Sequence, residues 1–366
     1  MSFSLRLKNE LTKRLDFPLL ILVLLLMAVS LFALYSSSQG DVAKVSAQAK
    51  NFIFALIVMW FVAKIPFGYL SRLALPLYCL ALILLVLTML VGDQAKGAQR
   101  WLDLQVIRVQ PSELMKIALP LTLAWYFDRF ERVLRPRHYL FAIFLLLIPT
   151  ILILKQPDLG TAILVLASGV FVIFFSGVSL RTIGFIVTLT VLLMPFAWSV
   201  LEPYQQVRIL TLLNPSSDPL GAGYHTIQST IAIGSGGFWG KGWLSGTQSQ
   251  LNFLPEGTTD FIFAVLAEEF GFIGVLLVFL IYFLLIWRSL TIAIQAPNNF
   301  SRLAAMSIVL TFFVYAFVNI GMVIGVLPIV GVPLPLISLG GSSAVTISIG
   351  FGVLMNFRAN HRLVQT

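Results

Sequence analysis

Long apolar runs, separated by short polar stretches, recur along almost the whole chain. A helix that crosses a lipid bilayer needs roughly 20 mostly apolar residues, and ten runs reach or approach that length. They cover residues 17–35, 52–65, 75–91, 114–127, 139–154, 161–175, 183–201, 261–287, 303–326 and 337–355. The pattern predicts an all-α polytopic membrane protein with about ten transmembrane helices. An even number of crossings places both termini on the same side of the membrane.

The composition supports this fold class. Hydrophobic residues make up 58% of the 366 residues and charged residues only 11%, which is far from the composition of a soluble globular protein. The first apolar run follows basic residues, as a secretory signal does, but further spans come after it, so we interpret it as the first membrane helix. We expect residues 1–366 to form a single membrane domain.

Lysine and arginine are distributed unevenly over the predicted connections. Most of the 24 basic residues fall on the face that carries both termini, and an excess of Lys and Arg marks cytoplasmic loops. We therefore expect both termini in the cytoplasm. The net charge of +9 follows from this topology, so the basic composition gives no reason to expect a nucleic-acid partner.

Cysteine and histidine are scarce. The chain has one cysteine, in an apolar run, and three histidines that lie far apart in sequence. This excludes a disulfide framework and a thiolate metal cluster, and the histidines lack the spacing of metal ligands. No cofactor is evident from the sequence, which also shows no cage of ligands for a divalent cation.

The predicted connection at residues 92–113 is basic although it should face outward. It contains Lys96, Arg100 and Arg108, and Lys116 follows one turn into the next helix. Cations on the translocated side oppose the usual insertion bias, so we expect them to bind an anion. Acidic residues in the same segment leave the alternative that these cations form only local ion pairs.

The connection at residues 202–260 is much longer than most others. Long loops on a compact scaffold are usually functional or disordered, and apolar residues at near-helical spacing in 205–213 and 224–233 favour interfacial helices over the outer mouth. The glycine-rich part, residues 234–246, does not match a Walker A phosphate loop. We expect this part to be a flexible lid whose backbone amides, together with Lys241, can approach an anion.

A carboxylate stands where this loop meets the next apolar run. Asp260 follows Thr258 and Thr259 and precedes a predicted helix. One interpretation makes Asp260 an N-cap that accepts a helix N–H. The other makes it a general base at the membrane surface, where partial desolvation raises the pKa of a carboxyl group. The two interpretations are compatible.

Further ionisable residues are predicted at membrane depth. Glu268 and Glu269 lie within an apolar span, where a charge is costly and often functional. We favour a role for them as partners of a buried cation or backbone donor rather than in catalysis. Asp158 lies between Pro157 and Gly160 at a predicted helix break. There a tight charged turn is the alternative to a ligand-binding role.

A second helix break is predicted near the C-terminus. The prolines at 333 and 335 and the glycines and serines of 340–343 interrupt the start of the last span. Such a break is tolerated at membrane depth only where it lines a cavity or is buried in protein, so Ser342 is a candidate ligand-binding residue. Together, the outward face offers a carboxylate, cations, a lid and broken helices around one mouth. This combination suits an amphiphile with an anionic head.

These motifs, taken in order, resemble the SEDS family of shape, elongation, division and sporulation proteins. The resemblance rests on KGAQRW at 96–101, QPSE at 110–113, QPDLGT at 156–161, GYH and IQS within 223–229, GSGG and GKG within 234–242, TDFIFAVLAEE at 259–269, and PLPLISLGGSS at 333–343. It covers nearly the whole chain. QPDLGT and GTQSQLNFLPE resemble the elongation branch of the family more than its division branch.

The resemblance implies a ten-helix peptidoglycan glycosyltransferase. Such an enzyme polymerises lipid II into β-1,4-linked glycan strands at the outer face of the bacterial inner membrane during cell elongation. It works with a class B penicillin-binding protein that supplies transpeptidation. Asp260 matches the essential aspartate of the family and is the expected general base. Many relatives carry histidine immediately before that aspartate, where this chain has Thr259.

The implied reaction assigns roles to the outward cations. An α-linked donor and a β-linked product imply a single inversion at MurNAc C1, and the leaving pyrophosphate needs its charge neutralised. We expect Arg100 to do this first, and Glu113 to orient Lys116 at helical spacing. Grooves between the helices would hold the lipid tails. The candidate substrate-binding residues are Lys96, Arg100, Arg108, Glu113, Lys116, Asp158, Lys241 and Ser342.

Two other functions fit parts of the pattern. A lipid II flippase or transporter also has membrane carboxylates, broken helices and outward cavities, but it needs polar residues along the inner halves of its helices, which are almost uniformly apolar here. No inverted repeat is evident either. A non-enzymatic scaffold of the cell-wall elongation complex would tolerate replacement of Asp260 without loss of polymer synthesis.

Overall fold

The structure is a computed structural model. It describes residues 15–364, with gaps at 96–97, 104–107, 132–133, 180, 183, 185–187, 189–191, 194–195, 197, 200, 220, 252 and 255. Its long helices are α2 (Phe17–Ser37), α3 (Val42–Lys64), α4 (Phe67–Val91), α5 (Pro111–Arg129), α6 (Pro136–Lys155), α7 (Leu159–Phe175), α12 (Ile262–Ile294), α13 (Asn299–Val323) and α14 (Gly341–Val364).

The predicted all-α polytopic membrane fold is confirmed. Among the described residues, six helices are long and apolar enough to cross a membrane: α2, α3, α4, α6, α12 and α13. The span predicted at 183–201 falls largely outside the described residues. The total of ten crossings therefore stays a prediction.

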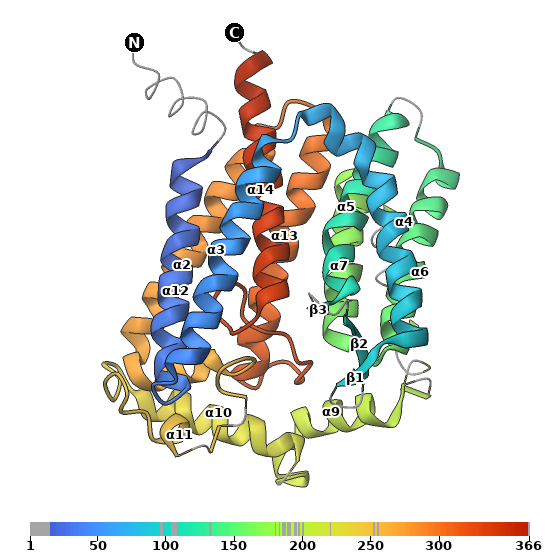
Figure 1. Cartoon of the computed structure of the whole chain (residues 1–366). Coiled ribbons are helices and arrows are strands. Elements are labelled where there is room, and N and C mark those ends of the chain that lie inside the picture. Colours follow the sequence, from blue (N-terminus) through green and yellow to red (C-terminus); the bar gives the residue numbers. More distant parts are fainter. Residues whose placement is uncertain are drawn as a thin grey trace, which may run out of the picture.

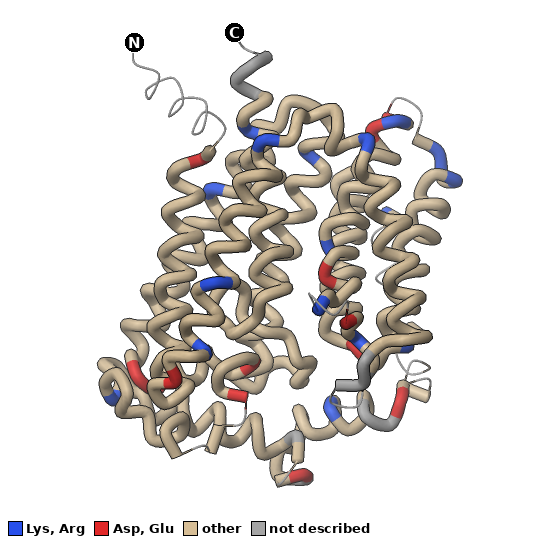
Figure 2. The backbone as a smooth tube through the Cα atoms, in the orientation of Figure 1, with Lys and Arg blue, Asp and Glu red and all other residues tan. Residues whose placement is uncertain are grey.

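The helices run side by side as one bundle (Figure 1). The start of α2 and the end of α14 lie at the same end of the bundle, as an even number of crossings requires. Lys and Arg predominate at that end, whereas acidic and basic residues are mixed toward the other end (Figure 2). We call the other end, where the strands lie, the strand end.

The strand end is built from the two long connections. β1 (Asp93–Ala95), β2 (Ala98–Asp103) and β3 (Arg108–Val109) form a small antiparallel sheet in that order. The sequence predicted no strands, because these are too short for an alternating pattern to stand out. The second connection forms α9 (Pro203–Leu213), the 3₁₀ turn η2 (Pro215–Ser217), α10 (Ala222–Gly236) and α11 (Thr247–Gln250), which lie across the strand end (Figure 1). The helices predicted at 205–213 and 224–233 are thus confirmed.

α3 begins earlier than its apolar run. Asp41 accepts the N–H groups of Lys44 at 3.2 Å and Ala43 at 3.0 Å, and so satisfies donors that have no partner inside the helix. These hydrogen bonds, that from Lys44 foremost, hold the pKa of the Asp41 carboxyl below its ordinary value. With this cap the helix starts at Val42 rather than at residue 52, because polar residues continue it beyond the apolar stretch.

α5 and α13 form the centre of the bundle. α5 packs against α4, α6, α7 and α14, and α13 packs against α5, α7, α12 and α14. Both are buried on most of their surface, whereas α2, α3, α4 and α6 expose large apolar side chains. The surrounding helices therefore shield polar groups on α5 and α13 from lipid.

α12 is interrupted within its length. At Gly271 the backbone has φ 62° and ψ −160°, so the intrahelical hydrogen bonds are broken there. Residues 237–242, which we call the glycine strap, replace them: two strap N–H groups donate to the carbonyls of Glu268 and Glu269, each at 3.0 Å. The span predicted at 261–287 is present as α12, but its apolar pattern did not show that a glycine turns the chain within it.

The glycine strap is hydrogen-bonded into this break, whereas its composition predicted a flexible lid. Its Lys241 turns inward, with Nζ 2.7 Å from Glu268 Oε1. The Thr247 hydroxyl and the Gln248 N–H donate to the same oxygen at 3.1 and 3.0 Å. Glu268 is fully buried, and a buried charge needs partners. Lys241 and the Gln248 N–H are such partners, as its position in an apolar span led us to expect. The neighbouring Glu269, also buried, accepts a hydrogen bond from the hydroxyl of Ser36.

Replacing Gly271 with alanine should destabilise the protein. A Cβ there would lie 2.3 Å from the Gly240 nitrogen and 2.8 Å from the Phe238 carbonyl oxygen. The positive φ disfavours any side chain as well. We expect the free energy of unfolding to fall by roughly 1–3 kcal/mol, measured as a lower midpoint of thermal unfolding in detergent. Gly234→Ala is the matched control, because an added Cβ there meets nothing within 4 Å; equal midpoints for the two variants would contradict the role of Gly271.

Lys241→Met should leave the buried carboxylate of Glu268 without its cation. An uncompensated buried charge is strongly unfavourable, and we expect a loss of about 2–3 kcal/mol in the free energy of unfolding. Adding Glu268→Gln removes the charge and should restore most of this stability. Thermal unfolding of the single and double variants measures both effects. A single variant as stable as the unmodified protein would show that the ion pair does not stabilise the helix break.

Candidate active site

A cleft of about 500 Å³ opens at the strand end of the bundle. Its walls come from β2, from the starts of α5, α7 and α14, from α9, α10 and α13, and from the loops before α12 and α14. Its polar lining residues are Arg100, Gln110, Glu113, Asp158, Thr161, Arg208, His225, Glu256, Thr259, Asp260, Tyr315, Ser342 and Ser343. The cleft thus gathers charges of both signs from distant parts of the sequence.

Asp260 lies in the turn before α12 and borders the cleft. The N-cap of α12 is Phe261, so the interpretation of Asp260 as the N-cap is wrong, because the helix starts one residue later than its apolar run. The backbone oxygen of Asp260 accepts a hydrogen bond from the Asn319 amide at 2.8 Å, and the same amide donates to the Val332 carbonyl at 2.7 Å. One buried side chain of α13 therefore fixes the turn that carries the carboxylate.

The loop before α14 holds this turn from the other side. The Ser338 hydroxyl donates to the Thr259 carbonyl at 2.5 Å. Gly331 lies beside the carboxylate, since a Cβ added there would be 3.6 Å from Asp260 Oδ2. Ser342 borders the cleft at the start of α14. The prediction that this broken helix start lines a cavity is confirmed.

Arg100 and Asp158 form one corner of the cleft. Arg100 Nε lies 3.7 Å from Asp158 Oδ2, and the guanidinium also donates to the Pro157 carbonyl. Asp158 caps α7 by accepting the Thr161 N–H at 3.2 Å, and the Gln110 amide donates to it at 3.3 Å. Asp158 therefore holds a tight charged turn, as the alternative interpretation required. It also positions the Arg100 side chain, which is 30% exposed.

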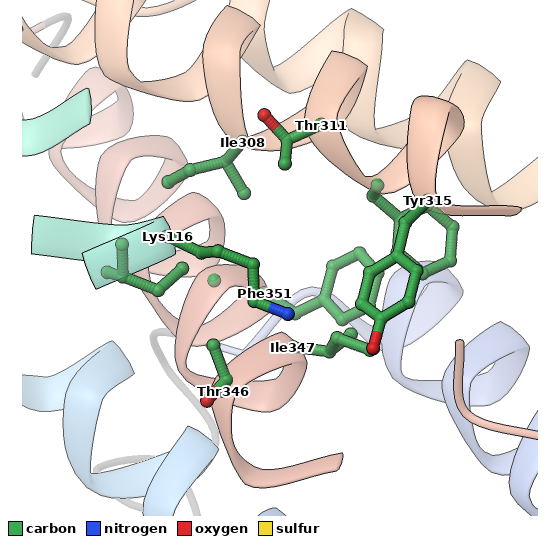
Figure 3. A pocket seen from close by; sticks show the side chains of 10 residues that line it. Lys116, Ile308, Thr311, Tyr315, Thr346, Ile347 and Phe351 are labelled. Atoms are coloured by element: carbon green, nitrogen blue, oxygen red, sulfur yellow. The ribbon is translucent and has the colours of Figure 1, made fainter. Parts of the chain in front are cut away.

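Glu113 and Lys116 form a buried ion pair on α5, with Lys116 Nζ 2.7 Å from Glu113 Oε1. The contact expected from their helical spacing is thus present. Glu113 borders the cleft, but Lys116 borders a separate, mainly apolar pocket of about 40 Å³. In that pocket (Figure 3) its ammonium group lies 4.4 Å from the centre of the Tyr315 ring. Tyr315 borders both spaces, so one aromatic ring separates Lys116 from the cleft.

Two other predicted ligand-binding cations lie away from the cleft lining. Arg108 is 70% exposed and pairs with Asp103 at 3.2 Å, which is the local ion pair considered as the alternative. Lys241 is bound to Glu268 at the break in α12. Lys96 lies outside the described residues.

The sequence did not predict Arg208, His225 and Glu256 as site residues. They border the cleft from the connection at residues 202–260. Near-helical spacing predicted α9 and α10 but did not show which of their faces meets the bundle. His225 belonged to one of the motifs, yet only the packing of α10 against α12 and α13 places it in the cleft. A histidine in a predicted interfacial helix is the one signal that pointed to this residue.

The cleft can both accept a proton and bind an anion. Asp260 supplies a carboxylate for proton transfer, and Arg100 supplies a guanidinium suited to phosphate oxygens. Within the described part of the chain, no group of three or more His, Cys, Asp or Glu side chains is placed to hold a metal ion. The groups that the cleft offers for chemistry are a carboxylate and a fixed cation beside membrane helices.

Known proteins resemble this chain over almost its full length. Residues 13–363 match the model of the cell cycle protein family that is named for FtsW, RodA and SpoVE. The chain is 48% identical over 352 residues to the peptidoglycan glycosyltransferase MrdB of Escherichia coli K12, covering 96% of this chain and 95% of the relative. It is 36% identical over 362 residues to the probable peptidoglycan glycosyltransferase FtsW of Trichlorobacter lovleyi, covering 95% of this chain and 94% of that protein.

Solved structures share the fold. The rod shape determining protein RodA of Thermus thermophilus matches with a TM-score of 0.71 at 28% identity, over 95% of this chain and 96% of that chain. A chain from work on the structural coordination of polymerization and crosslinking by a peptidoglycan synthase complex matches with a TM-score of 0.81 at 35% identity, over 95% of this chain and 97% of that one. The chain therefore belongs to the FtsW, RodA and SpoVE family of cell cycle proteins, the SEDS family that its motifs resemble.

Proposed function

We propose that this chain is a peptidoglycan glycosyltransferase that polymerises lipid II into β-1,4-linked glycan strands. The activity named for its relatives supports the reaction class. The observation that carries the chemistry is the cleft, which brings the carboxylate of Asp260 and the guanidinium of Arg100 into one space. General-base and anion-binding groups are the two functions that such a transfer requires.

The proposed reaction is a single displacement at the anomeric carbon of the donor. Asp260 takes the proton from the 4-hydroxyl of the acceptor GlcNAc, and the resulting oxygen nucleophile attacks MurNAc C1. The bond from C1 to the pyrophosphate oxygen breaks, and undecaprenyl pyrophosphate leaves with both bonding electrons. Because the donor is α-linked and the product β-linked, one displacement inverts the configuration. A positioned general base contributes about 10² to 10⁴ to the rate of such a step.

Arg100 would neutralise the leaving pyrophosphate. Asp158 and the Pro157 carbonyl hold its guanidinium at the cleft, and a preorganised cation needs little rearrangement as negative charge develops. Ser342 borders the cleft at the start of α14 and can bind a sugar hydroxyl or a phosphate oxygen. The lipid tails would lie along the apolar outer surfaces of the helices.

The protein would lie in the bacterial inner membrane with the cleft facing the periplasm. Its apolar helices make it a multi-pass membrane protein. The predominance of Lys and Arg at the end opposite the cleft (Figure 2) supports a cytoplasmic location for that end. This orientation puts the reaction on the side where the cell wall is built.

A class B penicillin-binding protein is the proposed partner. One structural relative comes from a peptidoglycan synthase complex that couples polymerization with crosslinking. A polymerase that makes glycan strands without peptide crosslinks needs such a transpeptidase close to its product. Pairing of the two enzymes would therefore deliver new strands directly to the crosslinking site.

The cleft favours an enzyme over a lipid II flippase or a scaffold. A flippase needs a polar path through the bundle, whereas the charged residues of the cleft gather at the strand end. A scaffold needs no carboxylate in a cleft. Asp260, held by Asn319 and bordering a space of about 500 Å³, is better explained by chemistry on a bound substrate.

Asp260→Asn and Asp260→Ala should abolish polymerisation, lowering the rate by about 10²- to 10⁴-fold, because neither side chain accepts the hydroxyl proton. The measurement is glycan-strand formation from labelled lipid II by the purified protein with its penicillin-binding partner. Asp260→Asn keeps the size of the side chain and is the closer test. Both variants should retain partner binding and thermal stability, since the hydrogen bond that fixes the turn uses a backbone oxygen.

Normal polymerisation by the two Asp260 variants would rule out Asp260 as the general base. Lipid II movement between the leaflets of a vesicle, measured with the same proteins, tests the flippase function separately. The proposed enzyme should show no such movement beyond that of empty vesicles.

A further inference from the structure

One wall of the cleft is formed by α9 and α10, and the proposed reaction does not use its side chains. Arg208 of α9 and His225 of α10 both border the cleft. They come from the long outer connection, whereas Arg100 belongs to β2 and Asp260 to the turn before α12. The cleft therefore has a second cation and an imidazole on the wall that α9 and α10 form.

His225 contacts the residue that follows the proposed base. Its imidazole stacks on the ring of Phe261, with centroids 5.6 Å apart and the two planes inclined by 19°. Phe261 directly follows Asp260, and all three residues border the cleft. A neutral imidazole has one hydrogen-bond donor and one acceptor, so it can bind a sugar hydroxyl. A sugar bound there would lie in the same cleft as the carboxylate.

α10 is firmly attached to α12 and α13. The Ser229 hydroxyl donates to the Val323 carbonyl at the end of α13 at 2.9 Å. At the C-terminal end of α10, a Cβ on Gly236 would lie 2.0 Å from the Ala267 carbonyl oxygen of α12. Glycine there permits a very close approach of the two helices. Side chains carried by a helix fixed in this way can hold a substrate in a defined position.

Arg208 belongs to the same wall. It borders the cleft and also a small adjoining pocket that Thr211, Thr226 and Ile329 line. α9 and α10 contact each other, and Thr226 is the residue after His225 in α10. Arg208 and His225 are thus presented to the cleft by one packed unit.

The proposed reaction joins the sugars of two lipid-linked substrates, each of which carries a pyrophosphate. The donor loses its pyrophosphate, whereas the acceptor keeps its own, one disaccharide away from the hydroxyl that attacks. Each pyrophosphate carries negative charge that a guanidinium can bind through paired hydrogen bonds. Arg100, positioned by Asp158, is assigned to the leaving group. The remaining arginine in the described lining is Arg208.

We propose that Arg208 and His225 form the acceptor subsite. His225 hydrogen-bonds the terminal sugar of the acceptor and holds its 4-hydroxyl toward Asp260, while Arg208 binds the pyrophosphate that the acceptor retains. The proton still goes to Asp260, so neither residue takes part in the bond changes. This inference rests on the proposed glycosyltransferase function and divides the cleft between the two substrate molecules.

The test varies acceptor and donor separately. Lipid II with hydrogen in place of the terminal 4-hydroxyl can serve only as donor. With this analogue at a saturating concentration, ordinary labelled lipid II is titrated as acceptor, and the capped single-coupling product is measured with the full chain and its penicillin-binding partner in nanodiscs. We expect Arg208→Gln and His225→Phe each to raise the acceptor KM about tenfold, as the loss of one strong hydrogen bond does, with kcat changing less than about threefold.

Three further variants serve as controls for the acceptor subsite. His225→Gln keeps a donor and an acceptor and should stay within about threefold of the unmodified enzyme. Lys44→Gln removes an outer cation whose side chain is 52% exposed at the start of α3, outside the cleft lining, and should change neither KM. Arg100→Gln should raise the KM for the donor analogue when that substrate is varied. Thermal unfolding of every variant establishes that the fold is retained.

An unchanged acceptor KM in folded Arg208→Gln and His225→Phe proteins would overturn the acceptor subsite, and so would an increase confined to the donor KM. In either case, coupling by the unmodified enzyme would leave the proposed function intact. Failure of the unmodified enzyme to couple lipid II at all would instead refute the proposed function. The two failures are therefore distinguishable within one set of assays.

Discussion

Backbone N–H and C=O groups within a bilayer have no water to bind, so each must find a partner in the protein. This constraint shapes two of the helix breaks in the described part of the chain. At Gly271 the glycine strap supplies N–H groups to the carbonyls of Glu268 and Glu269. Before α14, Asn319 and Ser338 take up carbonyl and N–H groups of the surrounding loops. The cleft is lined by the loop before α14 and by the turn with Asp260, where backbone and polar side chains can be exposed without facing lipid.

The same constraint separates charges that stabilise the fold from charges that can meet a substrate. Buried ionic groups need close partners, because desolvation is costly. Lys241 with Glu268 and Lys116 with Glu113 satisfy this requirement at 2.7 Å, and both carboxylates are almost fully buried. Arg100 is different, since its side chain is partly exposed at the cleft and its contact with Asp158 Oδ2 is longer. An incoming phosphate can therefore approach Arg100 without breaking a tight pair.

The division of the cleft between two substrates would explain why the long connection folds into helices. A loop over the mouth could exclude water without regular structure, but binding a second large substrate needs side chains in fixed positions. α10 meets this need through its close contact with α12 at Gly236 and its hydrogen bond to the end of α13. Because α12 follows the turn with Asp260 and α13 holds that turn through Asn319, the acceptor wall and the base would share one support.

Most of the architecture follows from local patterns in the sequence. The length of the apolar runs predicts membrane helices. The polar residues at the start of one run point to Asp260. Each of these signals lies within a single segment of the chain, so no tertiary contact is needed to detect it. The three short strands and the interruption at Gly271 escaped such reasoning, since they depend on partners supplied by other segments. Helical spacing alone was enough to pair Glu113 with Lys116.

By itself, the sequence determined that this is a helical membrane protein and that Asp260 stands at the start of a span. Only the tertiary structure decided which charged residues share a cleft with it. Arg108 and Lys241 were candidate ligands together with Arg100, but Arg108 pairs with Asp103 on the surface and Lys241 pairs with Glu268. The reason is physical: distances between residues on different helices depend on how those helices pack, and no local pattern encodes them.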